Sequence, residues 1–365
     1  MMKSKTDGRA IVECVPNFSE GRDMNIIRQI TNEIESVDEV SLLHVDSGEA
    51  ANRTVVTFVG PPEAVAEAAF RAVRKAGEVI DMRRHHGAHP RIGATDVLPL
   101  IPVSGITLEE CAALARSLAR RIADEAGIPC YCYEAAAFRP GRKNLAVCRA
   151  GEYESLPEKL ADPDKRPDFM PPVSHLSPLT PHILKTGCTV VGARNFLIAV
   201  NFNLNTTDTR IASTIACDVR EKGRPKRDPV TGMPVHGADG KPVMVPGTLK
   251  STKAIGWYID EYGIAQVSMN LTNLEVTPLH TAFDEVCRCA DRRGVRVTGT
   301  EIVGLVPRQA LIDAGRHYLG RQQRSTTIPE EHILNTAITA MGLDDLRPFN
   351  PKEKVIEFLM DEKAI

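Results

Sequence analysis

The fold of this chain is decided by the stretch VSLLHVDSGEAANRTVVTFVGPPEAVAEAAFRAVRKAGEVI, which runs from Val40 to Ile80. Its first part predicts two strands, Val40 to Asp46 and Thr54 to Gly60, because both are rich in aliphatic and β-branched residues and a short polar segment separates them. Its second part predicts a helix, because Pro61 and Pro62 open it and its apolar side chains recur at helical spacing.

Elements on both sides of this stretch complete a β-α-β-β-α-β order. Upstream, Ile11 to Val15 predicts a strand, and the isoleucines from Ile26 to Ile34 predict a helix that Asp23 caps. Downstream, Val97 to Ile101 predicts the last strand. This order is typical of the ferredoxin-like split βαβ unit.

The segment after this unit predicts an extension and then a linker. A helix from Leu108 to Ala126 and a strand from Pro129 to Tyr133 extend the first half. The run from Ala161 to Thr186 contains six prolines and no apolar period, which is typical of a linker. We therefore predict one subdomain over residues 1–186 and a second over residues 187–365.

The second half predicts the same order of elements without obvious residue identity to the first. Its predicted elements are the strand Phe196 to Asn203, the helix Asp208 to Lys222, the strands Lys253 to Ile259 and Ala265 to Leu271, the helix Pro278 to Arg293 and the strand Val295 to Val303. The expected fold is therefore α+β, with two tandem ferredoxin-like subdomains and a ligand tunnel or cleft between them, since domain interfaces favour small-molecule sites.

The segment from Gly223 to Gly247 interrupts this pattern with five glycines and five prolines. Such a composition is too irregular for one regular element. It is typical of a tolerated surface insertion, although a mobile loop or lid is an alternative. The sequence ADGK from Ala238 to Lys241 indicates a tight hairpin turn, so part of the segment is compatible with a small β-ribbon.

The composition of the 365 residues argues against several classes of protein. The 45 basic and 47 acidic residues leave a net charge of -2, which creates no field that attracts nucleic acid or a membrane surface. The polar N-terminus, Met1 to Ala10, lacks the apolar stretch expected of a signal peptide, and no later segment approaches the apolar length of a membrane span. The nine cysteines are scattered and odd in number, so they favour a reducing compartment, and we expect a cytoplasmic protein.

The densest polar segment is RRHHGAHPR, from Arg83 to Arg91. Loops on a rigid scaffold often carry catalytic groups, and Gly87 and Pro90 restrict the backbone around His89, so a preorganised acid or base is one interpretation. A solvated basic turn is an equally good one. Metal binding by His85, His86 and His89 is less favoured, because glycine and proline disrupt the helix that would align such ligands.

Other polar residues lie at the ends of predicted strands. Asp46 ends one strand, while Asn52 and Arg53 precede the next. Ser19 lacks the nucleophile-elbow motif of a serine hydrolase and is compatible with a helix cap. No phosphate-binding loop and no dinucleotide fingerprint occur, so any cofactor chemistry is expected to come from a cosubstrate.

Several motifs together closely resemble the formiminotransferase family. They are VECVPNFSEG from Val12, VDSG with NRTV from Val45, HHGAHPRIGATD from His85, AGEYESLPEKL from Ala150, VGARNFLIA from Val191 and IGWY from Ile255. The similarity covers nearly the whole chain. It implies a glutamate formiminotransferase fold of two ferredoxin-like subdomains, tetrahydrofolate as cosubstrate, no metal, and a homodimer. Because the cyclodeaminase domain of the animal fusions is not expected here, it also implies a separate cyclodeaminase partner.

The resemblance also implies roles for individual residues. His89 would be the catalytic acid and base, and Asp46 its nearby carboxylate. The folate-binding stretch would fall between Met170 and Gly187. The predicted substrate-binding residues are Asn52, Arg53, Met170, Pro171, Lys185, Thr186, Gly187 and Arg194. Of these, the arginines suit bidentate pairing with carboxylates, whereas for Lys185 an ordinary surface charge is the favoured interpretation.

The chemistry of formimino transfer is consistent with these residue types. N5 of tetrahydrofolate must lose a proton as it attacks the amidine carbon, and the departing glutamate nitrogen must gain one. A histidine can perform both steps, because its ordinary pKa of about 6.5 lies near neutral pH. Two alternatives remain open, namely a variant that acts on formylglutamate or 5-formyltetrahydrofolate, and a folate-binding protein without turnover.

Overall fold

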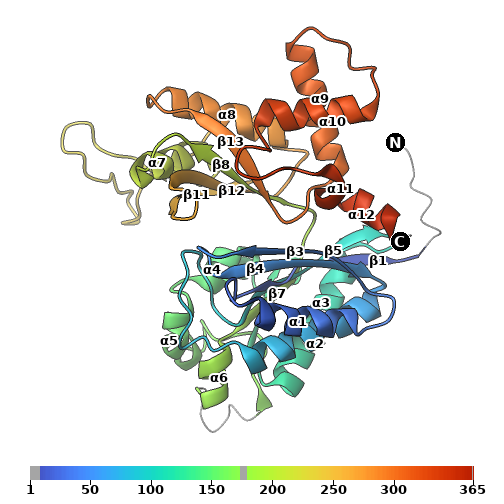
Figure 1. Cartoon of the computed structure of the whole chain (residues 1–365). Helices are drawn as coiled ribbons and strands as arrows, with labels where there is room; N and C mark the ends of the chain where they lie inside the picture. The colour runs from blue at the N-terminus through green and yellow to red at the C-terminus, as the bar shows by residue number, and fades with distance from the viewer. Residues whose placement is uncertain (1–8, 173–178, 364) are drawn as a thin grey trace. The chain divides into compact units, whose positions relative to one another are not determined.

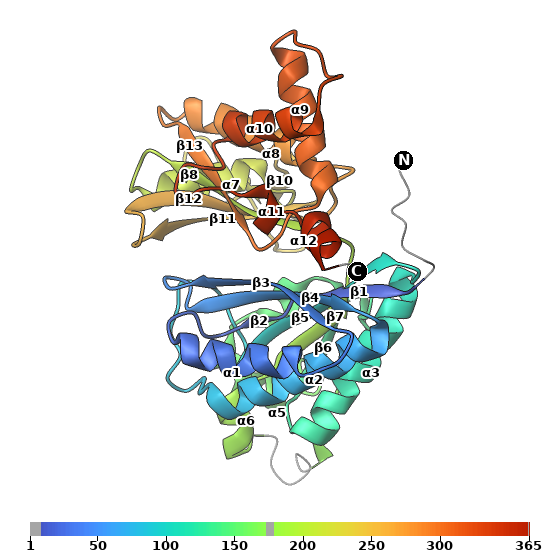
Figure 2. The ribbon, with the colours of Figure 1, turned by 45° about the vertical axis from the view of Figure 1, so that its right-hand side comes forward.

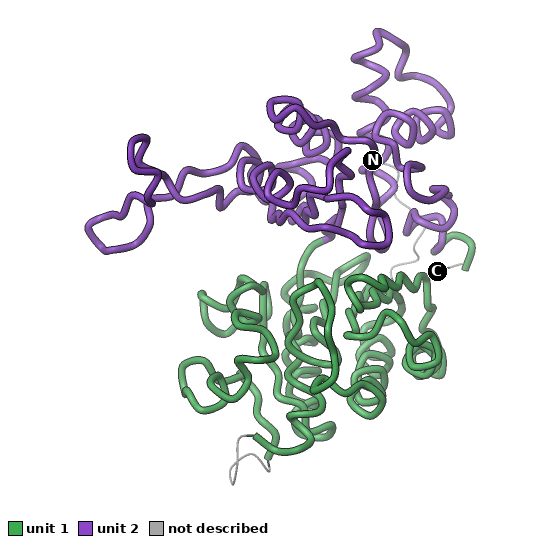
Figure 3. The backbone as a smooth tube through the Cα atoms, turned by 60° about the vertical axis from the view of Figure 1, so that its left-hand side comes forward, with its two compact units in different colours: residues 1–195, 360–365 green, residues 196–359 purple. Residues whose placement is uncertain are grey.

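The computed structural model describes residues 9–172, 179–363 and 365, which form two compact units (Figure 3). The first unit runs to Asn195 and takes in Met360–Ile365. The second unit is Phe196–Leu359. Within the described ranges, none of the helices combines the length and the apolar character needed to cross a membrane.

A seven-stranded sheet forms the centre of the first unit (Figure 1). β1 and β2 follow one another in the same position, where both pair with β4 and β5. The order across the sheet is therefore β3, β4, β1/β2, β5, β7, β6, in which β7 pairs in parallel with β5 and with β6 and the other pairings are antiparallel. The strands are β1 Ile11–Cys14, β2 Asn17–Phe18, β3 Ser41–Gly48, β4 Arg53–Gly60, β5 Thr95–Ser104, β6 Cys130–Glu134 and β7 Thr189–Ala193.

Three long helices cover one face of this sheet (Figure 2). They are α1 Met24–Glu35, α2 Pro62–Val79 and α3 Leu108–Ala126. Asp23 caps α1 through its side chain, and the predicted apolar stripe of α2 is buried, so both sequence predictions are confirmed. Thr107 and Glu110 form a capping box at the start of α3, and Gly127 ends it in the left-handed conformation.

Shorter helices pack against the opposite face of β5, β7 and β6 through a smaller apolar cluster. They are α4 Leu145–Arg149, α5 Leu156–Ala161 and α6 Pro181–Thr186, with 3-10 turns at Pro140–Lys143 and Tyr153–Ser155. Cys148, Leu156, Leu160 and Ile183 supply the buried apolar side chains from these helices. The segment expected to be a linker is thus folded onto the first sheet wherever it is described.

The predicted boundary after Thr186 is corrected by β7. This strand pairs with β5 on one side and with β6 on the other, so residues up to Asn195 belong to the first unit. Phe169 also exchanges two backbone hydrogen bonds with Cys130 at the start of β6. Parallel pairing with strands more than fifty residues away leaves no local signal, which is why the proline content suggested a linker instead.

The second unit contains a four-stranded antiparallel sheet of order β11, β12, β8, β13. In chain order its elements are β8 Ile198–Leu204, α7 Thr209–Val219, β11 Thr252–Ile259, β12 Ile264–Leu271, α8 Leu279–Asp291 and β13 Val297–Val303. The predicted β-α-β-β-α-β order is therefore observed. Its strand order matches that of β3, β4, β1/β2 and β5 in the first unit.

The second unit contains two further features besides this sheet and its two helices, a group of C-terminal helices and a small ribbon. Among the described residues after β13, the sequence pattern did not predict the helices α9 Arg308–Arg321, α10 Glu330–Met341, α11 Pro351–Lys354 and α12 Ile356–Glu362, of which α12 continues past Leu359 into the first unit. Between α7 and β11, the segment Gly223 to Gly247 forms a ribbon in which β9 Arg224–Pro225 pairs with β10 Met244–Val245. Gly240 adopts a positive φ in the turn between His236 and Pro242, as the ADGK turn predicts.

Candidate active site

The loop that connects α2 to β5 carries His89, and glycines allow it to lie against its neighbours. A Cβ on Gly87 would come within 2.1 Å of the Ala51 carbonyl oxygen, and one on Gly93 within 2.1 Å of the Cys188 carbonyl oxygen. On the side of the loop where Gly87 lies against Ala51, the Asn52 side chain donates to the His86 carbonyl at 2.9 Å. The loop is therefore fixed at both ends, as expected for a group that must be preorganised.

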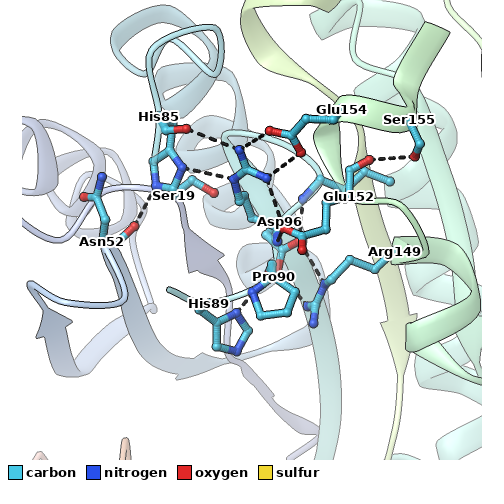
Figure 4. A network of polar contacts seen from close by, with 12 residues as sticks. Ser19, Asn52, His85, His89, Pro90, Asp96, Arg149, Glu152, Glu154 and Ser155 are labelled. Carbon is cyan, nitrogen blue, oxygen red and sulfur yellow. Dashed lines mark hydrogen bonds and ion pairs between the residues drawn. The ribbon is translucent and has the colours of Figure 1, made fainter. Parts of the chain in front are cut away.

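His85 closes this loop from within through hydrogen bonds to Asn52 (Figure 4) and to Arg91. Nε2 of His85 lies 2.8 Å from the Asn52 carbonyl oxygen, which can only accept, so Nε2 carries the proton. Nδ1 of His85 then accepts from Nε of Arg91 at 3.3 Å. Arg91 in turn pairs with Glu152 and Glu154 from the turn before α5.

These contacts argue against the hypothesis of a metal site on three histidines. Both ring nitrogens of His85 are already used in hydrogen bonds, so this side chain has no donor for a metal. His86 is exposed, and its backbone oxygen is what Asn52 binds. In the part of the chain that the structure describes, no set of three His, Cys, Asp or Glu residues is arranged to hold a metal ion.

The tautomer of His89 follows from one hydrogen bond. Nδ1 lies 2.7 Å from the Pro90 carbonyl oxygen, which has no proton to give, so Nδ1 is the donor. In the neutral ring the lone pair therefore sits on Nε2. Burial, together with the nearby cations Arg53 and Arg149, lowers the pKa of His89 to about 3. The half-buried ring is thus a neutral proton acceptor at neutral pH.

A buried carboxylate organises the cations beside His89. Asp96 is fully buried at the start of β5 and accepts from Nη1 of Arg53 and Nη2 of Arg149, both at 2.6 Å, and from the Ile92 amide at 2.9 Å. Although burial acts to raise the pKa of Asp96, the two guanidinium groups outweigh it and lower the pKa. Two cations and one anion leave this cluster with a net positive charge.

The structure brings some of the predicted residues into this cluster. Arg53 donates to Asp96 and Asn17, and Asn52 adopts a positive φ of 47° that lets its side chain reach both Gly21 and His86. Asp46 pairs with Val55 across β3 and β4, so it lies on the same sheet face as Arg53, two residues from Val55. Because Arg53 pairs with Asp96, it helps to hold the cluster together. The predicted role of Arg53 in substrate binding would be additional to this one.

Other predicted residues lie at the base of the loop. The Thr186 carbonyl accepts from the Ala94 amide, and Gly187 forms a bridge with Gly93. Lys185 donates to the Glu78 carbonyl at the end of α2, consistent with a structural charge. Arg194 follows β7, and Met170 and Pro171 precede residues 173–178, which lie outside the described residues.

Sequence reasoning did not assign Asp96, Arg91 or Arg149. Both Asp96 and Arg91 belong to the quoted HPRIGATD motif. The sequence signal that could have identified Asp96 as a site residue was its position at the start of an apolar strand. Ser19 was weighed as a helix cap. Its hydroxyl instead donates to the Gly93 carbonyl at 2.7 Å and is buried, so it also fixes the loop.

Comparison of the sequence with known protein families gives two matches. The sequence model of the N-terminal subdomain of the formiminotransferase domain matches residues 11–194, and that of the formiminotransferase domain matches residues 199–361. The chain belongs to the formiminotransferase family. The two matched regions meet close to the boundary between the two units at Asn195.

Individual relatives fall into two groups. Over 96% of its length the chain is 46% identical to formimidoyltransferase-cyclodeaminase of Sus scrofa, of which it spans 60%. Over 85% of its length it is 40% identical to glutamate formimidoyltransferase of Thermoplasma acidophilum and 41% identical to that of Streptococcus pyogenes serotype M1, of which it covers 92% and 93%. The chain thus spans about three fifths of the longer relatives.

The lowered pKa of His89 predicts how stability depends on pH. The unfolded chain binds a proton at His89 near pH 6.5, whereas the folded chain does so only near pH 3. The contribution of neutral His89 to the free energy of unfolding is therefore fully present above pH 6.5. It is lost as the pH falls toward 3, by at most about 1.4 kcal/mol per pH unit. Urea denaturation at about pH 7, 6 and 5 should give a shallower slope for His89→Asn than for the unmodified chain. Equal slopes would contradict the burial of this ring.

Proposed function

We propose that this chain transfers a formimino group between N-formimino-L-glutamate and N5 of tetrahydrofolate, with His89 as general base and then general acid. The observation that carries the proposal is the Nε2 lone pair of His89, fixed by the bond from Nδ1 to Pro90 and placed beside a net cationic cluster. The relatives named glutamate formimidoyltransferase support the same reaction for this chain.

His89 would act twice in this reaction. As N5 attacks the amidine carbon, Nε2 takes the proton of N5, and the Nδ1 bond to Pro90 keeps the imidazolium in place. When the carbon–nitrogen bond to glutamate breaks, Nε2 returns that proton to the departing nitrogen. The substrates carry carboxylates, and their arrival near Arg53 and Arg149 would offset the positive field, which raises the pKa of His89 toward a useful value.

The remaining sequence predictions belong to the same proposal. Asp46 would orient the imidazole or the amidine from the sheet face that it shares with Arg53. Asn52, Arg194 and the stretch from Met170 to Gly187 would contribute to substrate binding. The shared strand order of the two sheets supports the ferredoxin-like assignment, and a ligand tunnel or cleft stays part of the proposal. So do a homodimer, a cytoplasmic location and a separate cyclodeaminase that consumes the product.

The test of the function is a transfer assay on the purified chain. With tetrahydrofolate and formiminoglutamate we expect 5-formiminotetrahydrofolate to form over many turnovers. Parallel assays with formylglutamate measure whether the formyl donor is preferred, which would favour the formyl variant. Folate binding without any turnover on either donor would contradict the proposal and favour a binding protein.

Gly87→Ala tests whether the fixed loop matters for activity. The added methyl group would meet the Ala51 carbonyl oxygen, so the loop must move away from the turn between β3 and β4 and carry His89 with it. Because a displacement of about 1 Å can cost roughly 10²-fold in rate, we expect kcat to fall at least about tenfold. Gly141→Ala is the matched control, because a Cβ there meets nothing within 4 Å. Unchanged kcat in Gly87→Ala would show that the position of the loop is not critical.

A further inference from the structure

Arg149 is the last residue of α4, and one edge of its guanidinium group is held by Asp96. Nε donates to Oδ1 of Asp96 at 3.2 Å, and Nη2 donates to Oδ2 at 2.6 Å. Asp96 is itself fully buried and also accepts from the Ile92 amide. This two-point pairing orients the planar guanidinium, which leaves its other edge ready for a second acceptor.

The other edge of this guanidinium carries N–H groups that Asp96 does not use. A guanidinium has five N–H groups, and Asp96 accepts from two of them. Among the residues that the structure describes, none accepts a hydrogen bond from Nη1 of Arg149. The side chain is 13% exposed, and this exposure includes Nη1. Arg149 can therefore bind an anion that comes from outside the cluster.

The other two arginines around the loop are more fully engaged. Arg53 donates from Nε and from Nη1 to two acceptors of the cluster, and its side chain is 8% exposed. Arg91 has the same exposure and pairs with two glutamates. Of these three cations, Arg149 is thus the most open to a ligand.

Arg149 also lies beside the proton acceptor of the site. Figure 4 shows its guanidinium group next to Pro90, on the side where the ring of His89 lies. The lowered pKa of His89, which is due first to burial and then to Arg53 and Arg149, agrees with this proximity. Because the cluster holds two cations and one anion, one bound carboxylate would neutralise it. An anionic group of a substrate is therefore expected next to His89.

The covalent structure of the formimino donor decides which anion this is. In N-formimino-L-glutamate the α-carboxylate is attached to the carbon that bears the reacting nitrogen. This nitrogen must come within about 3 Å of Nε2 of His89 to receive its proton, so the α-carboxylate must lie close to the same ring. The γ-carboxylate lies further along the donor's side chain. The carboxylates of tetrahydrofolate lie beyond its benzoyl group, too far from N5 to reach Arg149 while N5 is at His89.

From this arrangement we propose that Arg149 binds the α-carboxylate of the formimino donor and makes the chain selective for formimino groups carried by α-amino acids. This inference rests on the proposed function, because that function supplies the donor. Arg149 would hold Asp96 with one edge and the α-carboxylate with the other, which places the reacting nitrogen beside Nε2 of His89. A donor without this carboxylate would leave the cationic cluster unbalanced and would be less well oriented.

The test compares two donors on the full chain. 4-(Formimidoylamino)butyrate is formiminoglutamate without its α-carboxylate, so the ratio of the two kcat/KM values measures what that carboxylate contributes. Arg149→Gln should lower this ratio at least about tenfold, because a charge-assisted pair contributes about 10–100-fold. Any difference in the intrinsic reactivity of the donors cancels in this comparison. Arg28→Gln, the same change at an exposed position of α1, should leave the ratio unchanged.

The ratio also separates binding from a purely structural role. If Arg149 only held Asp96 or set the field at His89, its loss would slow both donors equally, so an unchanged ratio in Arg149→Gln would overturn the inference. If Arg149→Gln does not fold, Arg149→Lys provides the second variant. It keeps the charge but loses the two-pronged geometry, so the ratio should still fall at least about threefold.

Binding without turnover distinguishes this inference from the proposed function. N-acetyl-L-glutamate and 4-acetamidobutyrate are unreactive analogues of the two donors. Calorimetry on the unmodified chain should give a Kd at least about tenfold weaker for 4-acetamidobutyrate, and equal Kd values would overturn the inference. The expected difference in a chain that transfers no formimino group would reject the function and retain this site. Full transfer activity with the same donor ratio in Arg149→Gln would reject the inference alone.

Discussion

His89→Asn should lower kcat for formimino transfer by about 10²–10⁴-fold, the range that a positioned acid or base contributes. Asparagine can keep the hydrogen bond to the Pro90 carbonyl, but it has no basic nitrogen in place of Nε2. The Kd for folate should therefore stay within about threefold of the unmodified value. Stopped transfer with retained binding would identify the proton shuttle.

His86→Asn is the matched control for this variant. It makes the same substitution three residues earlier in the same loop, at an exposed side chain. We expect its kcat and folate affinity to match those of the unmodified chain. Equal activity in His89→Asn and His86→Asn would contradict a catalytic role for His89.

Asp96→Asn should cause the largest loss of stability among single changes at the site. Asp96 is fully buried and pairs with two arginines, so neutralising it leaves Arg53 and Arg149 without a counter-ion in a buried setting. Removing one partner of such a pair typically costs about 3–5 kcal/mol. Chemical denaturation at pH 7 would measure the decrease in the free energy of unfolding.

Asp164→Asn controls for the loss of a carboxylate in general. Asp164 is exposed, and its backbone carbonyl rather than its side chain accepts from Arg139 and Arg142. Its free energy of unfolding should stay within about 0.5 kcal/mol of the unmodified chain. A loss of less than about 1 kcal/mol in Asp96→Asn would mean that water or other groups compensate the two arginines.

The sequence predicted elements best where their signals are local. Asp23 as a cap, the proline start and apolar stripe of α2, and the ADGK turn each depend on residues within a few positions, and all three are observed. The helices after β13 were missed. The predicted boundary failed for a different reason, because β7 is a strand only through its partners β5 and β6.

The candidate site shows the same division. The sequence alone determined that the loop from Arg83 to Arg91 is polar and restricted, that the motifs are those of the formiminotransferase family, and that His89 is the residue to test. Only the tertiary structure decided that Nε2 of His89 holds the lone pair, that His85 is a structural group, and that Asp96 gathers Arg53 and Arg149. The physical reason is that propensities and motifs act along the chain, whereas burial, tautomers and charge pairing depend on residues that only folding brings within a few ångströms.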